Sequence, residues 1–379
     1  MFFWAIFDQS ASTWIFFADT YMDTTLLGER ADGGTVLLSG AATESFTGGI
    51  ASAVSAVTGL FGGAPLAGTR SFGLSADAIQ GFNAVFIVLL VPVSVWLFKT
   101  LDRRGMGVSP TRKMMLGFFL TGLSMAIMSL SASLAGTKQE VLKVTTPEGV
   151  LIVPQKAGEE LAPVSGGAAV GADVRVTATD FAYDAKKKKL EFASGKIVLK
   201  DGRELVITNG HLAAGGLPDA AGLAAGGVAE NLLKSGDDLA KVKSEPTKAA
   251  VEVVNWVKPS ERVTVWWQVF AYLIITVAEI LISVTGLELA FVAAPKTMKS
   301  FVTGCWLAVV FLANLLINAP ITQLYQYMTP GAYFAMLAGA MAVVVVVFVP
   351  VAGQFNRAMA RMKEAEAAAK AAEGNTETV

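Results

Sequence analysis

The sequence predicts an all-α membrane protein of six spanning helices, with a β-rich, water-soluble domain inserted between the third and the fourth helix. Two features of the composition support this fold class. The chain of 379 residues is 53% hydrophobic and only 16% charged, whereas soluble domains are about a quarter charged. Its 30 basic and 31 acidic residues are unevenly spread, because more than half of them lie between Thr137 and Thr264. An apolar body therefore carries a polar insert.

Five stretches are apolar over the roughly 20 residues that a membrane-spanning helix requires. They are residues 77–98, 114–135, 266–291, 301–323 and 331–352. A sixth stretch, Met1–Tyr21, is apolar but is interrupted by Asp8, Gln9 and Asp19. A signal peptide would begin with basic residues and end with small ones. We therefore interpret Met1–Tyr21 as a helix that the sequence enters partway, as if earlier chain were missing.

Basic residues in the short connections orient the helices, because such residues concentrate on the cytoplasmic side. Ten basic residues lie on the side of the C-terminus: Lys99, Arg103, Arg104, Arg112, Lys113, Lys296, Lys299, Arg357, Arg361 and Lys363. The opposite short connections, 23–76 and 324–330, carry only Arg30 and Arg70. We expect the C-terminus to be cytoplasmic and the insert to be extracytoplasmic.

The predicted organisation has four parts. Residues 1–135 hold the first three spans, 136–261 form the insert, 262–355 hold the last three spans, and 356–379 form a cytoplasmic tail. The insert contains short alternating runs between Glu140 and Thr208 that are typical of strands, with a hairpin turn signal at 200–203. In the Gly/Ala-rich outer connection 23–76, the stretch Gly48–Gly63 is compatible with a helix that lies on the surface.

Polar residues inside the spans are the candidate functional residues, because ionisable groups at membrane depth cost several kcal/mol unless they face a cavity or a partner. Asp8 lies in the first span and Glu279 near the middle of the fourth. Asn83 lies near the outer end of the second span, although asparagine also joins helices in many membrane proteins. Trp4 is one turn from Asp8 and shares its face. Trp4 and Trp306 suit either an aromatic belt or the wall of a pocket.

Composition also excludes several function classes. A net charge of −1 argues against a nucleic-acid partner. The single cysteine and the single histidine, Cys305 and His211, exclude an internal disulfide, a cysteine-cluster metal site and a multi-histidine site. An intramembrane enzyme would need more than Asp8 and Glu279, because these two carboxylates come with no nucleophile, metal ligands or catalytic motif.

Four motifs carry a resemblance to a known family. The segment FWAIFDQSASTWIFFAD resembles the seventh-helix signature FWALFDQQGSTW of the proton-dependent oligopeptide transporters, a branch of the major facilitator superfamily. QGFNAVFIVLLVPV is similar to the eighth helix of that family, AEILISVTGLELAFVAAPKTMKS to its tenth and GCWLAVVFLANLL to its eleventh. The motifs occur in the family order, and the resemblance covers residues 1–135 and 262–355. It implies a six-helix half bundle that corresponds to helices seven to twelve of a twelve-helix transporter.

The resemblance also implies roles for individual residues. Glu279 matches the glutamate that binds the amino terminus of the peptide, and Asn83 matches the asparagine that contacts the same amine. Trp4 and Trp306 match aromatic residues that line the side-chain subsites. Asp8 matches the acid that takes part in outer gating or proton coupling.

The family's first-helix motif ExxERFxYY and its fourth-helix lysine are absent from this sequence. The resemblance therefore implies a separate N-terminal six-helix half as a partner, with di- and tripeptides as substrates, protons as the coupling ion and no other cofactor or metal. The expected location is the inner (plasma) membrane of a bacterium. Two alternatives stay open, namely an inactive truncated fragment and a non-transporting membrane protein that displays the outer domain for binding.

Overall fold

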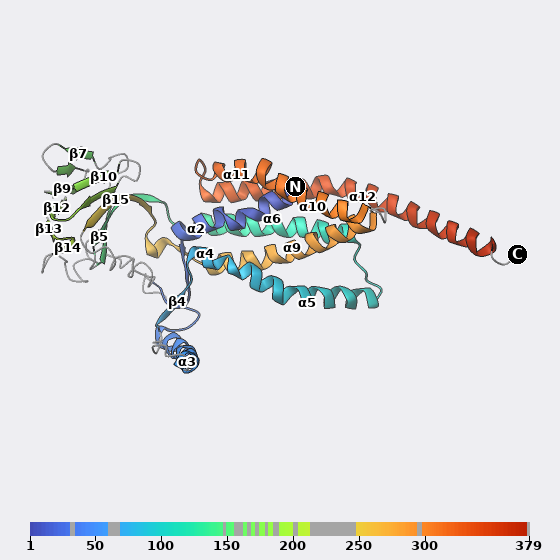
Figure 1. Ribbon diagram of the computed structural model, residues 1–379, viewed down its shortest axis with the longest axis horizontal. Helices are drawn as coiled ribbons and strands as arrows, with labels where there is room; N and C mark the ends of the chain where they lie inside the picture. Colours follow the sequence, from blue (N-terminus) through green and yellow to red (C-terminus); the bar gives the residue numbers. More distant parts are fainter. Residues whose placement is uncertain are drawn as a thin grey trace. The chain divides into compact units, whose positions relative to one another are not determined.

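The computed structural model divides the chain into two compact units. One unit comprises Met1–Arg30, Gly34–Ala135 and Val263–Val379, and the other comprises Ala31–Gly33 and Gly136–Arg262. The structure describes residues 1–30, 35–59, 69–146, 149–154, 162–164, 168–170, 174–178, 181–184, 189–199, 204–212, 248–293 and 298–376. Figure 1 shows the long helices of the first unit and the strands of the second.

Long apolar helices build the first unit. They are α4 (Ala76–Ile79) with α5 (Gly81–Arg103), α6 (Pro110–Leu134), α9 (Trp266–Ala293), α10 (Lys299–Ala313) with a π-helical turn η4 (Asn314–Asn318) and α11 (Ala319–Leu324), and α12 (Pro330–Thr376). Within the described residues, five helical segments are long and apolar enough to cross a membrane. They correspond to the five continuous spans that the sequence predicts. The part of the tail that the structure describes, from residue 356 to Thr376, continues α12 as a helix.

The first predicted span is broken in the structure. It consists of α1 (Phe2–Phe7), a 3₁₀ turn η1 (Asp8–Ala11) and α2 (Thr13–Tyr21). Side-chain hydroxyls compete for the backbone carbonyls at this break, since Ser12 Oγ donates to Asp8 O at 3.4 Å and Thr13 Oγ1 donates to Gln9 O at 3.2 Å. The sequence predicted a helix over Met1–Tyr21, whereas the structure divides this stretch into two short helices, and Asp8 and Gln9, two of the three polar residues that interrupt its apolar sequence, lie at the break.

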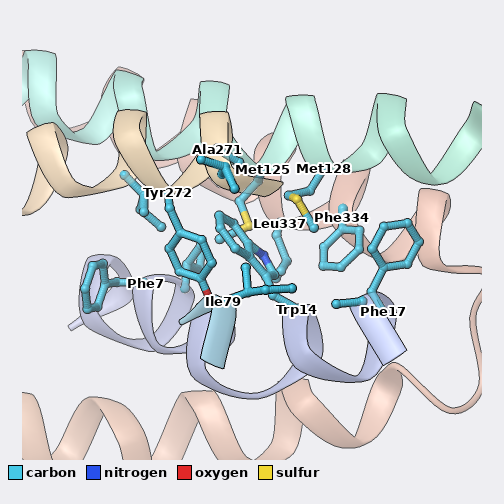
Figure 2. Packing of buried hydrophobic residues seen from close by; sticks show 14 of the residues in the cluster. Phe7, Trp14, Phe17, Ile79, Met125, Met128, Ala271, Tyr272, Phe334 and Leu337 are labelled. Carbon is cyan, nitrogen blue, oxygen red and sulfur yellow. The ribbon is translucent and has the colours of Figure 1, made fainter. Parts of the chain in front are cut away.

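Helix α6 forms the centre of the bundle and packs against both α9 and α12. Gly117 brings α6 close to α9, because a Cβ atom at this position would lie 2.6 Å from Cγ1 of Ile282. Trp14 of α2 is fully buried against this layer and meets Tyr272 of α9 edge to face, with the ring centroids 4.9 Å apart. Figure 2 shows Trp14 between Tyr272 and Phe334. The aromatic core thus holds the broken first span against the bundle.

Short strands connect the helices at one end of this unit. Strand β1 (Met22–Asp23) pairs in parallel with β16 (Val263–Thr264), so the end of the first span is joined to the beginning of α9. Strand β2 (Thr25–Glu29) lies between β3 (Thr35–Val36) and β4 (Ser71–Gly73). Helix α3 (Gly40–Gly59) packs on β2 and β4. It begins eight residues before the helix that the sequence suggested, whose last residues, 60–63, lie outside the described ones.

The second unit contains two antiparallel sheets, which confirms the β-rich character expected of the insert. Its five-stranded sheet has the order β10-β11-β15-β5-β6, and its six-stranded sheet the order β14-β13-β12-β9-β8-β7. The strands of the first are β5 (Gln139–Thr146), β6 (Gly149–Pro154), β10 (Phe181–Asp184), β11 (Lys189–Phe192) and β15 (Ala249–Trp256). Those of the second are β7 (Ala162–Val164), β8 (Ala168–Val170), β9 (Val174–Ala178), β12 (Gly195–Leu199), β13 (Glu204–Thr208) and β14 (His211–Leu212).

A hairpin was expected around residues 200–203, and these residues lie outside the described ones. The strands that flank them, β12 and β13, pair antiparallel with Val198 opposite Glu204. A short 3₁₀ turn η2 (Pro259–Glu261) ends the unit.

Candidate functional site

Asn83 and Glu279 meet between two helices of the first unit. Asn83 lies in the first turn of α5 and Glu279 near the middle of α9. The Nδ2 atom of Asn83 donates to Oε2 of Glu279 at 3.4 Å, while its Oδ1 atom accepts a hydrogen bond from Oγ1 of Thr276 at 2.5 Å. Thr276 is three residues before Glu279, so both side chains lie on the same face of α9. The Asn83 amide is therefore oriented by two partners on one neighbouring helix.

Asp8 brings the broken first span to this pair. Its carboxylate is close enough to Glu279 for the two negative charges to repel each other, and it interacts with the side chain of Asn314. Asp8, Asn83 and Glu279 are each half-buried. Three separate segments thus contribute to one acidic cluster within the bundle, which we call the Asp8–Asn83–Glu279 cluster.

Gln9 is a second polar centre at the same break, and it is fully buried. Its Nε2 atom donates to Oδ1 of Asn318 and, at 3.0 Å, to Oγ1 of Thr322. Its Oε1 atom accepts from the hydroxyl of Tyr333 at 2.6 Å and from Oγ1 of Thr13 at 3.1 Å. One glutamine side chain therefore connects the first span to the η4–α11 segment and to α12.

Further hydrogen bonds connect the Gln9 centre to the surroundings of Asp8. Asn318 Nδ2 donates to Oδ1 of Asn314 at 2.7 Å, and Asn314 in turn interacts with Asp8. On the α9 side, the Tyr272 hydroxyl donates to the carbonyl oxygen of Ser10 at 2.7 Å. The polar groups exposed by the helix break thus find partners in the bundle, as buried polar groups must inside a bilayer.

The two candidate tryptophans have aromatic or glycine neighbours in the described part of the chain. Trp4 is half-buried and lies edge-on to Phe3 and Phe7, with centroid distances of 5.1 and 5.8 Å. Trp306, on α10, is also half-buried, and its ring covers Gly286 of α9 so closely that a Cβ atom there would overlap it. The contacts that define their positions are therefore ring contacts, not hydrogen bonds to Asn83 or Glu279.

Sequence reasoning did not single out Gln9, Thr276 or Tyr333. The spacing of Thr276 and Glu279, three residues apart on one helix, was a signal that could have identified Thr276. Over the described residues, His, Cys, Asp and Glu form no group of three or more that could hold a metal ion.

The sequence matches the family model described as "PTR2: POT family" over residues 60–201 and 239–336, together more than half of the chain. The chain belongs to the POT family. This membership and the long apolar helices confirm the predicted fold class and the placement in a membrane.

Curated relatives of this POT-family chain are named as transporters. "Peptide transporter 3" of Caenorhabditis elegans is 38% identical over 100 residues, which are 26% of this chain and 14% of that protein. "Solute carrier family 15 member 2" of Mus musculus is 35% identical over 92 residues, which are 24% of this chain and 12% of that protein. Each match thus spans less than a sixth of the relative's length.

Solved structures of transporters of the same family also align with the chain. A crystal structure of the peptide transporter POT in complex with sulfate covers 94% of this chain and 38% of its own, with 15% identity and a TM-score of 0.45. A POT family transporter in complex with 5-aminolevulinic acid covers 93% of this chain and 39% of its own, with 14% identity and a TM-score of 0.45.

Proposed function

We propose that this POT-family chain forms the C-terminal half of a proton-coupled symporter for di- and tripeptides. In this proposal the half bundle supplies one wall of a central cavity that opens alternately to the two sides of the membrane. The observation that carries the proposal is the contact between Asn83 and Glu279, which puts an acceptor for a cationic group inside an apolar bundle. Substrate sites of such transporters lie near the bilayer midplane between the two halves.

Glu279 suits the ammonium group of a peptide. A peptide amino terminus is a cation with several donors, and a carboxylate bound to it forms a charge-assisted hydrogen bond. The present partner of Glu279 is a neutral amide at 3.4 Å, a long hydrogen bond that an ammonium group can replace at small cost. Asn83 would then keep its contact with Thr276 and offer its amide to the same ligand.

The proximity of Asp8 to Glu279 suits proton coupling. Two carboxylates that share a site away from water repel each other, and a proton or a substrate ammonium removes one of the two negative charges. Arrival of one cation therefore changes the free energy of binding the other. Because Asp8 lies at the break of the first span, a change in its charge would act directly on that segment.

Trp4 and Trp306 would line the regions that receive the peptide side chains. Both indoles are half-buried and present aromatic surface, which binds varied apolar groups without strict geometry. Gly286 lets the Trp306 ring lie directly on α9, the helix that carries Glu279.

The proposal includes a partner half and a location. Six further helices, on the same or on another polypeptide, would close the cavity and supply the basic groups for the peptide carboxylate. The assembled transporter would lie in the inner membrane of a bacterium, with the C-terminus cytoplasmic and the β-rich unit extracytoplasmic. The distribution of Lys and Arg in the short connections supports this orientation.

Uptake of a labelled dipeptide into proteoliposomes, driven by a pH gradient, tests the proposal. The transporter is assembled by expressing the chain with a family first half, and Glu279→Gln is expected to abolish the accumulation. Glu288→Gln is the matched control, because Glu288 lies on the same helix but is exposed. Equal uptake by the Glu279→Gln variant and the unmodified protein would contradict the proposal and favour a membrane protein that displays its outer unit for binding.

A further inference from the structure

Over residues 40–52, helix α3 packs small and polar side chains, Thr43, Thr47 and Ala51 among them, and exposes its two large apolar ones. On its packed side Thr43 is fully buried, and Thr47 Oγ1 accepts from the Thr69 amide at 2.8 Å and donates to the Thr69 carbonyl at 2.9 Å. Phe46 and Ile50, four residues apart on one flank, are 52% and 51% exposed. A helix on the surface of a soluble domain has the opposite arrangement, with its apolar stripe against the core.

The other flank of α3 is polar. Ser45 and Ser52 are exposed, and each hydroxyl bonds to a carbonyl one turn earlier in the helix. Glu44 pairs with Arg70, with 3.7 Å between Oε2 and Nε, and Arg70 also reaches Glu29 at 3.5 Å. One flank of the helix is thus suited to water, while the flank with Phe46 and Ile50 is suited to an apolar medium.

The turn before α3 also presents apolar side chains. Leu37 has a φ of 57°, a left-handed conformation that is uncommon for residues other than glycine, and its side chain is 68% exposed. The amide of Leu38 donates to the carbonyl of Val36 at 2.6 Å, which closes a tight turn around Leu37. Such a conformation is unfavourable for leucine, and in water the exposed side chain would offset none of its cost.

The place of α3 in the chain indicates what covers these apolar side chains. The helix lies in the connection between Tyr21, where α2 ends, and Ala76, where the next span begins. One compact unit contains these two spans together with β2, β4 and α3. Within that unit, Figure 1 shows α3 nearly end-on while α5, α6 and α9 run across the view. The helix therefore lies crosswise to the membrane helices, at their end opposite the Lys/Arg-rich connections.

We infer that α3 is an interfacial helix whose flank of Phe46 and Ile50, together with Leu37, inserts into the bilayer surface. Interfacial helices lie in the membrane plane with an apolar face buried roughly 5–10 Å below the headgroups and a polar face in water. The short tether to two membrane spans makes the lipid surface the nearest apolar medium. The inference is independent of transport, because it concerns how the connection between two spans is held at the membrane.

Site-directed fluorescence on the full chain in lipid vesicles tests the inference. Cys305 is the one cysteine of the sequence, so a Cys305→Ser background allows a bimane label at a single new position. Phe46→Cys and Ile50→Cys report on the apolar flank, and Ser52→Cys is the matched control on the polar flank of the same helix. All three side chains are exposed, so the substitutions leave the packing of α3 intact. Each labelled protein is treated with doxyl-labelled phosphatidylcholine and, separately, with iodide in water.

Insertion predicts that labels at positions 46 and 50 are quenched by the doxyl lipid and protected from iodide. With a label buried roughly 5–10 Å below the headgroups, the ratio of lipid to iodide quenching should be at least about fivefold higher at position 46 than at position 52. Equal iodide quenching at positions 46 and 52 would overturn the inference, because α3 would then lie in water. Protection of position 46 from both quenchers would also overturn it, since a protein surface and not lipid would then cover this flank.

Discussion

Asn83 and Glu279 are 196 residues apart in the sequence, and their side chains meet at 3.4 Å between Nδ2 and Oε2. Thr276 supports this relationship from the other side of the amide, because its hydroxyl, which also lies 2.7 Å from the carbonyl oxygen of Tyr272, donates to Asn83 Oδ1 at 2.5 Å. An amide has one acceptor oxygen and one NH₂ group, so a donor at Oδ1 directs the NH₂ group toward Glu279. Thr276 thus orients a group that we propose to contact the substrate.

Removal of the Thr276 hydroxyl is expected to weaken dipeptide binding. Thr276→Val keeps the shape of the side chain but leaves Asn83 free to rotate away from Glu279. The loss of one such hydrogen bond, about 1 kcal/mol, corresponds to a roughly fivefold increase in the apparent KM for uptake. Thr303→Val on α10 is the control, because the Thr303 hydroxyl bonds only to the backbone of its own helix in the described structure and is exposed. An unchanged KM in Thr276→Val would show that the amide needs no such support.

Gln9→Leu is expected to destabilise the bundle. The substitution removes the acceptor of the Tyr333 hydroxyl and the amide that donates to Asn318 and Thr322. Asn318 and Thr322 keep a hydrogen bond to each other, whereas a buried hydroxyl that loses its acceptor costs about 1–3 kcal/mol. Thermal unfolding of the purified chain in detergent, followed by scanning fluorimetry, measures the effect as a lower Tm. Gln323→Leu, at an exposed position on α11, is expected to leave the Tm unchanged. Equal Tm values for the two variants would mean that the Gln9 hydrogen bonds contribute nothing net.

Gly286→Ala is expected to disturb the packing of Trp306. The added methyl group would overlap the indole ring, so α9 and α10 must separate or the ring must turn. A loss of about 1–3 kcal/mol, read as a lower Tm, is typical of such overpacking. Gly304→Ala on α10 is the control, since its Cβ would meet no atom within 4 Å. In a Trp306→Ala background, Gly286→Ala should lower the Tm much less than it does in the unmodified protein, and an equal loss in both backgrounds would place the cause elsewhere.

The candidate residues could be identified from the sequence because charge is costly at membrane depth. Asp8 and Glu279 stood out on this ground alone, Asn83 stood out as a polar residue inside a span, and the sequence motifs implied a role for each. The structure then shows contacts that no periodicity reveals, since they join segments far apart in the chain. Gln9 is the clearest case, because a neutral side chain next to Asp8 in the sequence carries no signal of four hydrogen-bonded partners on three segments.

Local interruptions were the least predictable features of the fold. The apolar composition of Met1–Tyr21 favoured one helix, and the competition of Ser12 and Thr13 hydroxyls for backbone carbonyls at the break became visible only in three dimensions. Helix α3 shows the same limit in another way. Its Gly- and Ala-rich sequence did not indicate where the helix begins, and the exposure of Phe46 and Ile50 depends on which face of the helix packs against β2 and β4.

Competition between charged and uncharged peptides tests most directly the claim that Glu279 receives the peptide amino terminus. In the assembled transporter, inhibition of labelled dipeptide uptake is compared for alanyl-alanine and for its N-acetylated form, which lacks the positive charge. The unmodified protein should prefer the charged form by at least about tenfold, because a hydrogen bond between charged groups contributes about 1.5–3 kcal/mol. A Glu279→Asp variant that retains uptake should show a reduced preference, whereas Glu288→Gln should keep it. Equal inhibition by both peptides in the unmodified protein would contradict the account.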